Sequence, residues 1–165
     1  MSSYSSHLRF IILLYVGCII SESAFAQAKP CIFCLIGHGK VQQKQIVYKD
    51  SSVVAFMDHA PANPGHVLVI PLVHAKELTS VPDSTARNMM SVARRIAIAI
   101  KKTDIKADGF QLQVNSGEAA GQEVLHCHIH VKPRYTGETL NVTKAKASTD
   151  ELEETARKIR EALNR

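Results

Sequence analysis

The chain has 165 residues and a mass of 18.1 kDa, with 45% hydrophobic and 21% charged residues. This length predicts one compact domain that needs no disulfide scaffold, and the apolar content excludes an intrinsically disordered chain. A second long apolar run is absent, which excludes a polytopic membrane protein. The net charge of +5 favours anionic ligands. Without a concentrated basic stripe it does not indicate nucleic-acid binding, and we expect no nucleic-acid partner.

The first 26 residues have the pattern of a secretory signal peptide. A basic start at Arg9 precedes an 11-residue apolar run, Phe10–Ile20, which is shorter than the roughly 20 residues of a membrane-spanning helix. An A-x-A site ends at Ala26, so we expect cleavage there. The product would be exported, periplasmic or secreted if bacterial, without stable membrane insertion, and would fold as one domain over residues 27–165. An uncleaved anchor, a packed N-terminal helix and lipidation at Cys18 are the alternatives.

The rest of the chain predicts an α+β domain with a mostly antiparallel sheet, one long central helix and a C-terminal helix. Short apolar runs bounded by turn residues indicate strands, and apolar residues at helical spacing indicate helices. Ser148 and Glu151 form a capping box at the start of the last helix. The expected strands cover residues 46–49, 53–57, 66–70 and 110–114, and the expected helices cover 84–102 and 149–164.

The most informative segment is residues 124–131, where three histidines alternate with apolar residues. Side chains alternate across a strand, so we expect His126, His128 and His130 on one face and the apolar residues on the other. Three imidazoles about 7 Å apart along a strand indicate a metal, a substrate or mutual hydrogen bonds. A solvated histidine-rich surface is the alternative, and the apolar residues between the histidines argue against it.

The pattern His126-x-His128-x-His130 resembles the motif of the histidine triad (HIT) superfamily. Cys31-x-x-Cys34 and Pro133-Arg134-Tyr135 are similar to its bacterial, zinc-carrying Hint-like branch. The resemblance covers about residues 31–135 and implies an HIT-like α+β domain, commonly a homodimer whose sheets join edge to edge. Further motifs match in order: Ala55-Phe-Met-Asp58, Pro64-Gly65-His66, Val69-Ile-Pro71, His74, Asn115-Ser-Gly117 and Gly121-Gln122.

The resemblance implies that His128 attacks the α-phosphorus of a purine nucleotide and forms a covalent nucleotidyl-histidine, which water hydrolyses. Imidazole suits this task because it is nucleophilic at neutral pH. His130 and His66 would be its catalytic partners around the phosphate. Asp58 would accept hydrogen bonds from the ribose hydroxyls, and Asn115 and Gln122 would lie near the phosphate. The base would be sandwiched by four apolar residues, for which core packing is the alternative: Ile32, Phe33, Ile36 and Phe56.

The same resemblance implies a structural zinc ion held by Cys31, Cys34, His74 and His126. A closed zinc site needs four ligands, and a C-x-x-C pair supplies two thiolates. On sequence alone His38 competes with His74 for the third position. A disulfide or a redox-active dithiol is the rival interpretation, because oxidising compartments close exposed thiol pairs.

The leading hypothesis is therefore a hydrolase of purine nucleoside phosphoramidates or related nucleotidyl conjugates. Dinucleoside polyphosphate hydrolysis and nucleotidyl transfer are the enzymatic alternatives, and a non-catalytic nucleotide- or zinc-binding protein and a thiol-redox protein are the others. Three positions depart from the branch. Glu123 stands where Ser or Thr is usual, Lys132 where the residue is apolar, and His59 where it is aliphatic. They leave the nucleophile intact and bear on substrate preference and turnover.

Overall fold

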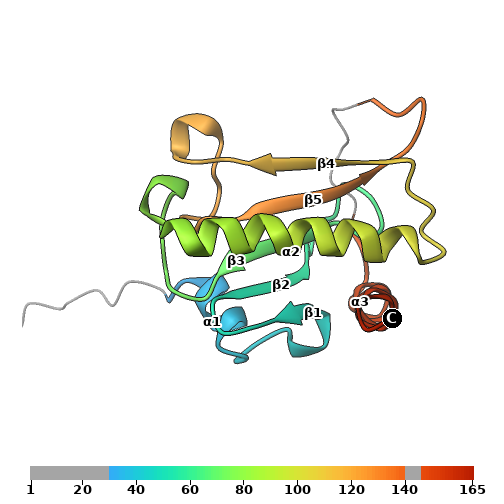
Figure 1. Ribbon diagram of the computed structural model, residues 1–165, viewed down its shortest axis with the longest axis horizontal. Coiled ribbons are helices and arrows are strands. Elements are labelled where there is room, and N and C mark those ends of the chain that lie inside the picture. The colour runs from blue at the N-terminus through green and yellow to red at the C-terminus, as the bar shows by residue number, and fades with distance from the viewer. Residues whose placement is uncertain (1–29, 140–145) are drawn as a thin grey trace, which may run out of the picture.

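The computed structural model describes residues 30–139 and 146–165. The expected signal peptide lies outside these residues, so cleavage after Ala26 and export stay predictions. Within the described residues, five strands form one sheet in the order β1-β2-β3-β5-β4, and every neighbouring pair is antiparallel (Figure 1). The predicted α+β class is confirmed. The strands are β1 (Ile46–Lys49), β2 (Val53–Met57), β3 (Val67–Pro71), β4 (Gly109–Val114) and β5 (Ile129–Arg134).

The two long helices lie where the apolar spacing places them. α2 (Asp83–Lys101) and α3 (Thr149–Leu163) begin and end within one residue of the predicted bounds. The Ser148 side chain accepts a hydrogen bond from the backbone N–H of Glu151, which confirms the capping box. A short helix, α1 (Ile32–Gly37), begins directly after Cys31 and was not predicted. No helix in the described ranges combines the length and apolar character needed to cross a membrane.

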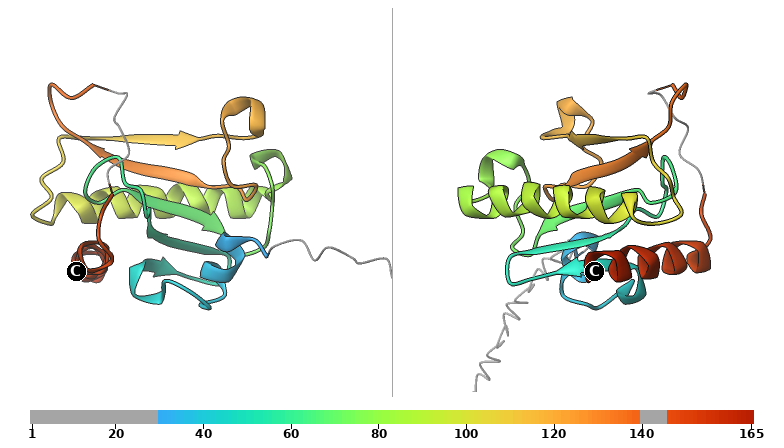
Figure 2. Two further views of the ribbon diagram at one scale, coloured as in Figure 1. Left: turned by 180° about the vertical axis from the view of Figure 1, so that it is seen from behind. Right: turned by 45° about the vertical axis from the view of Figure 1, so that its right-hand side comes forward.

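The two faces of the sheet are covered differently. One face packs against α2 and α3 through alternate strand residues such as Val53, Ala55 and Val69. The opposite face, which carries Phe56 and Leu68, packs against α1 instead. Figure 2 shows α1 on the far side of the sheet from α2. Because α1 has only six residues, it covers part of this face and leaves the rest open for a pocket.

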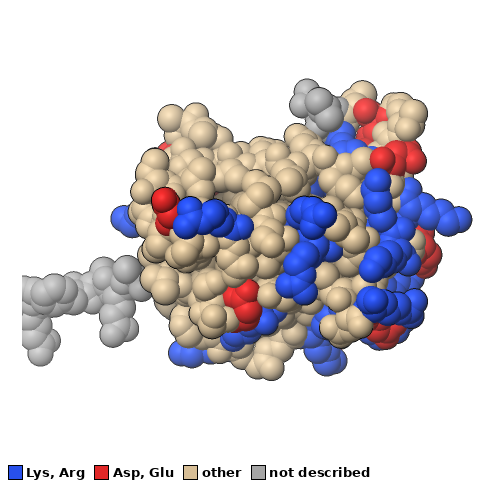
Figure 3. Space-filling view, in the orientation of Figure 1, with Lys and Arg blue, Asp and Glu red and all other residues tan. Residues whose placement is uncertain are grey.

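Basic side chains gather on the helix-covered face. In the orientation of Figure 1, Lys and Arg atoms concentrate over the C-terminal half of α2 and over α3 (Figure 3). The pocket described below opens on the other face, where α1 lies. The charge in Figure 3 therefore belongs to a surface separate from the pocket.

The histidine segment departs from its prediction as one strand over residues 124–131. β5 begins only at Ile129 and runs on through Arg134. Before it, the chain bends: the His126 N–H donates to the Val124 carbonyl at 2.7 Å, and the Cys127 N–H donates to Ala75 at 2.6 Å. These backbone bonds replace the strand ladder. Leu125 is accordingly 39% exposed and does not share the buried apolar face of Ile129.

Candidate active site and metal centre

A pocket with a volume of about 300 Å³ opens on the face of the sheet that carries α1. Its apolar part is lined by α1, β2 and β3, and its polar part by β5, β4 and the loop that follows β4. The pocket collects every predicted catalytic and nucleotide-binding residue except Gln122: His66, His128, His130, Asp58, Asn115, Ile32, Phe33, Ile36 and Phe56.

The hydrogen bonds of His128 fix its tautomer. Its Nδ1 lies 2.7 Å from the main-chain oxygen of His126. Because a carbonyl oxygen only accepts, Nδ1 carries the proton and Nε2 keeps a lone pair. The ring is 5% exposed and stands edge-on to Phe33, with 5.3 Å between the ring centres. His128 is thus held with an unprotonated Nε2, the form that a nucleophilic imidazole requires.

His66 and His130 form a second hydrogen-bonded unit. The Ala62 N–H donates to Nδ1 of His66 at 3.1 Å, so the His66 proton sits on Nε2. That Nε2 lies 3.0 Å from Nδ1 of His130 and donates to it. The His130 proton is consequently on Nε2, which makes this nitrogen a donor for a phosphoryl oxygen.

Asp58 adjoins this unit at the end of β2. Its Oδ2 lies 3.4 Å from Nε2 of His66 and 3.9 Å from Nδ1 of His130. The opposite carboxylate oxygen, Oδ1, accepts from the Ala60 N–H at 2.9 Å. The Asp58 N–H donates to the His66 carbonyl at 3.0 Å, which continues the pairing of β2 with β3 and sets the two residues face to face.

Gly65 allows the chain to reach His66 in this position. Its φ is +85°, a left-handed conformation that glycine adopts without strain. A Cβ at this position would lie 3.0 Å from Ile105 and 3.2 Å from Pro133. A side chain here would therefore displace the loop that aims His66 at Asp58.

Asp58, His66 and His130 also have the composition of a metal site, since their donor atoms lie within 4.8 Å of one another. A metal bound at Nε2 of His66 would require the proton to move to Nδ1. Nδ1 would then face the Ala62 N–H, a second donor, at 3.1 Å. The geometry therefore favours a hydrogen-bonded unit over a metal ligand set.

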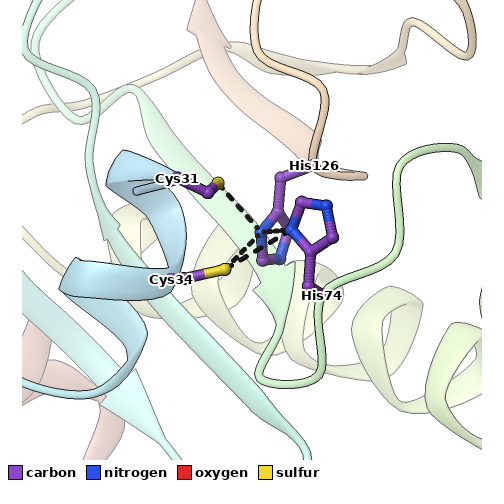
Figure 4. Close-up of side chains that lie close together, drawn as sticks. All are labelled: Cys31, Cys34, His74 and His126. Carbon is purple, nitrogen blue, oxygen red and sulfur yellow. Dashed lines mark hydrogen bonds between the residues drawn. The ribbon is translucent and has the colours of Figure 1, made fainter. Parts of the chain in front are cut away.

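A separate cluster brings together the four predicted metal ligands, Cys31, Cys34, His74 and His126 (Figure 4). The His74 and His126 Nδ1 atoms are 3.3 Å apart. The three recorded S···N distances are 3.4, 3.5 and 3.6 Å. Tetrahedral zinc with its usual bond lengths has edges of about 3.3 Å between two nitrogens and about 3.6 Å between nitrogen and sulfur. The donor set therefore fits a tetrahedral zinc ion in both chemistry and spacing.

The surroundings of His126 leave its Nδ1 with a lone pair that can bind a metal ion. Its Nε2 lies 2.9 Å from the Pro71 carbonyl and donates to it, which leaves Nδ1 unprotonated. Burial lowers the pKa of His126, the hydrogen bond to Pro71 partly opposes this, and the neighbouring His74 and His128 lower the pKa further, which together favour the neutral ligand form. Burial and the neighbouring Cys31 raise the pKa of the Cys34 thiol. A bound cation would reverse that effect by stabilising the thiolate.

His38 does not join this cluster. Its Nδ1 lies 2.6 Å from the Cys34 carbonyl, at the C-terminal end of α1. His74 occupies the third ligand position instead, as the family resemblance implies. Cys31 and Cys34 are both free thiols.

Gln122 lies behind the pocket. Its Nε2 donates to the Lys76 carbonyl at 2.7 Å and to the Val124 carbonyl at 2.9 Å. Its Oε1 accepts from the Gly117 N–H at 2.8 Å, and the residue is 5% exposed. Gln122 thus ties the loop after His74 to the histidine segment, and a contact with phosphate stays a prediction.

Two polar residues of the pocket, Gln42 and Gln113, were not predicted. The sequence does contain a signal for Gln113, because strand alternation places it on the opposite face of β4 from Leu112. In the sheet it pairs with His130. Gln42 follows α1 in a left-handed conformation and has no such sequence signal. The three departures, His59, Glu123 and Lys132, also line the pocket.

Comparison with known proteins supports the resemblance. The family model described as the HIT domain matches residues 39–137. A HIT-like protein of Methanocaldococcus jannaschii is 36% identical over 130 residues, which cover 79% of this chain and 98% of that protein. The crystal structure of a Zn-bound histidine triad family protein from Mycobacterium smegmatis is 36% identical, with a TM-score of 0.73. The match covers 82% of this chain and 94% of that one.

A histidine triad nucleotide-binding protein from Sulfolobus tokodaii is 29% identical, with a TM-score of 0.72, over 81% of this chain and 92% of that chain. The antiparallel sheet, the converging histidines and the family match all agree. The chain belongs to the HIT family.

Proposed function

We propose that this protein binds a purine nucleotide and hydrolyses the bond between its α-phosphorus and a leaving group, with nucleoside phosphoramidates as the substrate class. The observation that carries the proposal is the unprotonated Nε2 of His128 on the wall of a pocket with an apolar end. The Sulfolobus tokodaii relative is described as nucleotide-binding, which supports the choice of ligand.

In the first step, the lone pair on Nε2 of His128 forms a bond to phosphorus as the P–N bond to the leaving amine breaks. The amine nitrogen takes a proton from solvent. The Nε2–H of His130 donates to a phosphoryl oxygen and stabilises the negative charge that grows there. The Nδ1–H of His128 remains bonded to the His126 carbonyl, which holds the nucleotidylated ring in place.

In the second step, water attacks phosphorus and the bond to Nε2 breaks. The nucleoside monophosphate leaves, the His128 lone pair is restored, and water releases the proton that the amine consumed. Asp58 would accept hydrogen bonds from the ribose hydroxyls, and Phe33 and Phe56 would pack against the base. These two rings already form an edge-to-face pair with centres 5.4 Å apart.

The test is incubation with an adenosine phosphoramidate, followed by acid quench and intact-mass analysis. We expect AMP release by the unmodified protein, a transient mass increase of one AMP group on His128, and neither signal for His128→Ala. His38→Ala, a histidine variant outside the pocket, should keep both signals. AMP release by His128→Ala would overturn the assignment of the nucleophile. Tight AMP binding without turnover of any nucleotidyl substrate would instead favour a non-catalytic binding protein.

We also propose that the Cys31, Cys34, His74 and His126 cluster holds structural zinc. The tetrahedral spacing of the donor atoms supports this, and the Mycobacterium smegmatis relative is described as Zn-bound. The ion would fasten α1 to the loop after β3 and to the histidine segment. One equivalent of zinc in the purified protein, lost in Cys34→Ser, is the expected result of metal analysis.

We further propose a homodimer that joins through the edge strand β4. Strand order places β4 at the margin of the sheet, and Leu112 in its middle is 42% exposed. An apolar side chain on an unpaired edge favours association. We expect sedimentation to give twice the monomer mass, and Leu112→Asp to reduce it to one.

A further inference from the structure

The pocket changes character across the sheet in the order of the strands. Over β2 and β3 it is apolar, with Phe56 and Leu68 beneath α1. Over β5 it presents His130, and over β4 it presents Gln113. A nucleotide whose base lies over the apolar part and whose phosphate lies at the histidines would direct its leaving group toward β4. The residues at the β4 end of the pocket would therefore face the leaving group.

Lys132 belongs to this end of the pocket. It follows His130 by two residues on β5, so both side chains leave the same face of the strand. Its Nζ donates to Oε1 of Gln113 at 2.7 Å, and Gln113 pairs directly with His130 in the sheet. The lysine side chain thus runs back toward the level of His130 and holds its ammonium beside the triad.

Side-chain amides hold this arrangement. Gln113 donates through Nε2 to Oδ1 of Asn115 at 2.7 Å, and Asn115 donates through Nδ2 to the Gly121 carbonyl at 3.0 Å. Because Oε1 of Gln113 accepts from Lys132, its Nε2 must face Asn115, and this fixes the orientation of both side-chain amides. The donors therefore follow one another from Lys132 through Gln113 and Asn115 to the Gly121 carbonyl. Lys132 is half-buried and is the one lysine or arginine among the described residues that line the pocket.

We propose that Lys132 is a specificity-determining residue that selects substrates whose leaving group carries an anion close to the scissile bond. The anionic group, a carboxylate or a phosphate, would accept a charge-assisted hydrogen bond from the ammonium. This inference rests on the proposed nucleotidyl hydrolase function and names its substrate class more closely. Glu123 lines the same pocket but is exposed at the rim, where solvent screens its charge more strongly than that of Lys132.

The test compares three adenosine phosphoramidates that share the same P–N bond. Their leaving groups are alanine with a free carboxylate, alaninamide, which is neutral, and aminomethylphosphonate, which carries a phosphonate. We expect kcat/KM to be about tenfold higher for alanine than for alaninamide, as one charge-assisted bond supplies. The ratio of alanine to phosphonate decides whether a carboxylate or a phosphate-like anion fits better.

Variants locate the source of this preference. Lys132→Met should lower the alanine-to-alaninamide ratio to about one, because the neutral side chain cannot distinguish a carboxylate from an amide. Lys132→Gln should also give a ratio of about one, and Lys132→Glu should make alaninamide the better substrate. Lys101→Met removes the same charge from the last turn of α2, on the other face of the sheet, and should keep the tenfold ratio.

Two results would overturn the inference by itself: equal turnover of alanine and alaninamide conjugates by the unmodified protein, or an unchanged ratio in Lys132→Met. A protein that releases AMP from none of the three conjugates would overturn the proposed hydrolase function, and the specificity inference with it. The two failures therefore give different readings in the same assay.

Discussion

Nδ1 of His128 donates to the main-chain oxygen of His126 at 2.7 Å, and the ring of the same His126 faces the two cysteines of the metal cluster. One residue thus sets the tautomer of the proposed nucleophile through its backbone and offers a candidate metal ligand through its side chain. The candidate metal site and the pocket are thus joined through residues 126–128. A disturbance at the cysteines reaches the nucleophile through a single peptide unit.

Metal removal should therefore both destabilise the protein and weaken nucleotide binding. Zinc at a free concentration of one hundred times its Kd contributes about 2.7 kcal/mol to stability. For a domain of this size that corresponds to roughly 5–10 °C in Tm. Chelation is expected to lower Tm by this amount and to raise the Kd for AMP, measured by calorimetry. His38→Ala should respond to the chelator as the unmodified protein does. Equal Tm values with and without chelator would contradict the zinc assignment.

The His66–His130 hydrogen bond gives a second prediction. His66→Leu removes the Nε2–H that orients His130, and we expect kcat to fall on the order of 10²-fold with AMP affinity little changed. His66→Gln retains an N–H donor at a similar reach and should recover part of the loss. If the leucine and glutamine variants were equally impaired, the donor role of His66 would be wrong and bulk alone would explain the effect.

A third prediction decides whether Gln122 holds two loops together or contacts the substrate. Gln122→Ala leaves the carbonyls of Lys76 and Val124 and the N–H of Gly117 without their side-chain partner. An unmet buried polar group costs about 1–3 kcal/mol, so urea unfolding should show a clear loss of stability. Unchanged stability with a large rise in KM would instead show that Gln122 contacts the phosphate. Asn115→Ala, at the pocket wall, is the matched comparison.

Asp50 predicts how stability depends on pH. Burial raises its pKa, but hydrogen bonds from Asn88, Ser52, Val53 and Tyr48 outweigh burial and lower the pKa to about 2. The folded state therefore binds the proton less tightly than the unfolded state. The resulting stabilisation is complete above the ordinary value near 3.8 and is lost as the pH falls toward 2. It amounts to about 2 kcal/mol.

Asp50→Asn should remove this stabilisation at pH 7 and lose its effect near pH 2. Urea unfolding of both proteins across this range measures the difference. Asp83→Asn, whose side chain is 94% exposed, serves as the control and should differ little from the unmodified protein at any pH. A constant difference between Asp50→Asn and the unmodified protein over the whole range would contradict the role of ionisation.

Local periodicity predicted the long elements well, because α2 and α3 each carry a complete apolar face, and α3 also begins with a capping box. The start of β5 escaped prediction for a different reason. The alternation of residues 124–131 is that of a strand, but backbone bonds to Ala75 and Val124 bend the segment before Ile129. Ala75 is a tertiary partner, 52 residues from Cys127 in the sequence, and no alternation pattern contains such a contact.

In the site, too, some features could be predicted from the sequence and others could not. The HIT motifs named the candidate catalytic and binding residues, and the structure brings His66, His128, His130, Asp58 and the apolar residues together in one pocket. Gln122 departs because its amide has three backbone partners that only the folded loops supply. Lys132 was visible only as a departure from the family pattern. Its position beside Gln113 gives that departure a physical meaning.

The short length of α1 bears on the order in which the protein folds. Isolated helices of fewer than about 12 residues are marginal in water, and α1 has six. It can persist only after the sheet offers a surface for Phe33 and Ile36 and after the loop with His74 has formed. We therefore expect α1 to form on the sheet after the strands have paired, so that the α1 side of the pocket is completed late in folding. A newly made chain would then pass through a state with a paired sheet and an incomplete binding site.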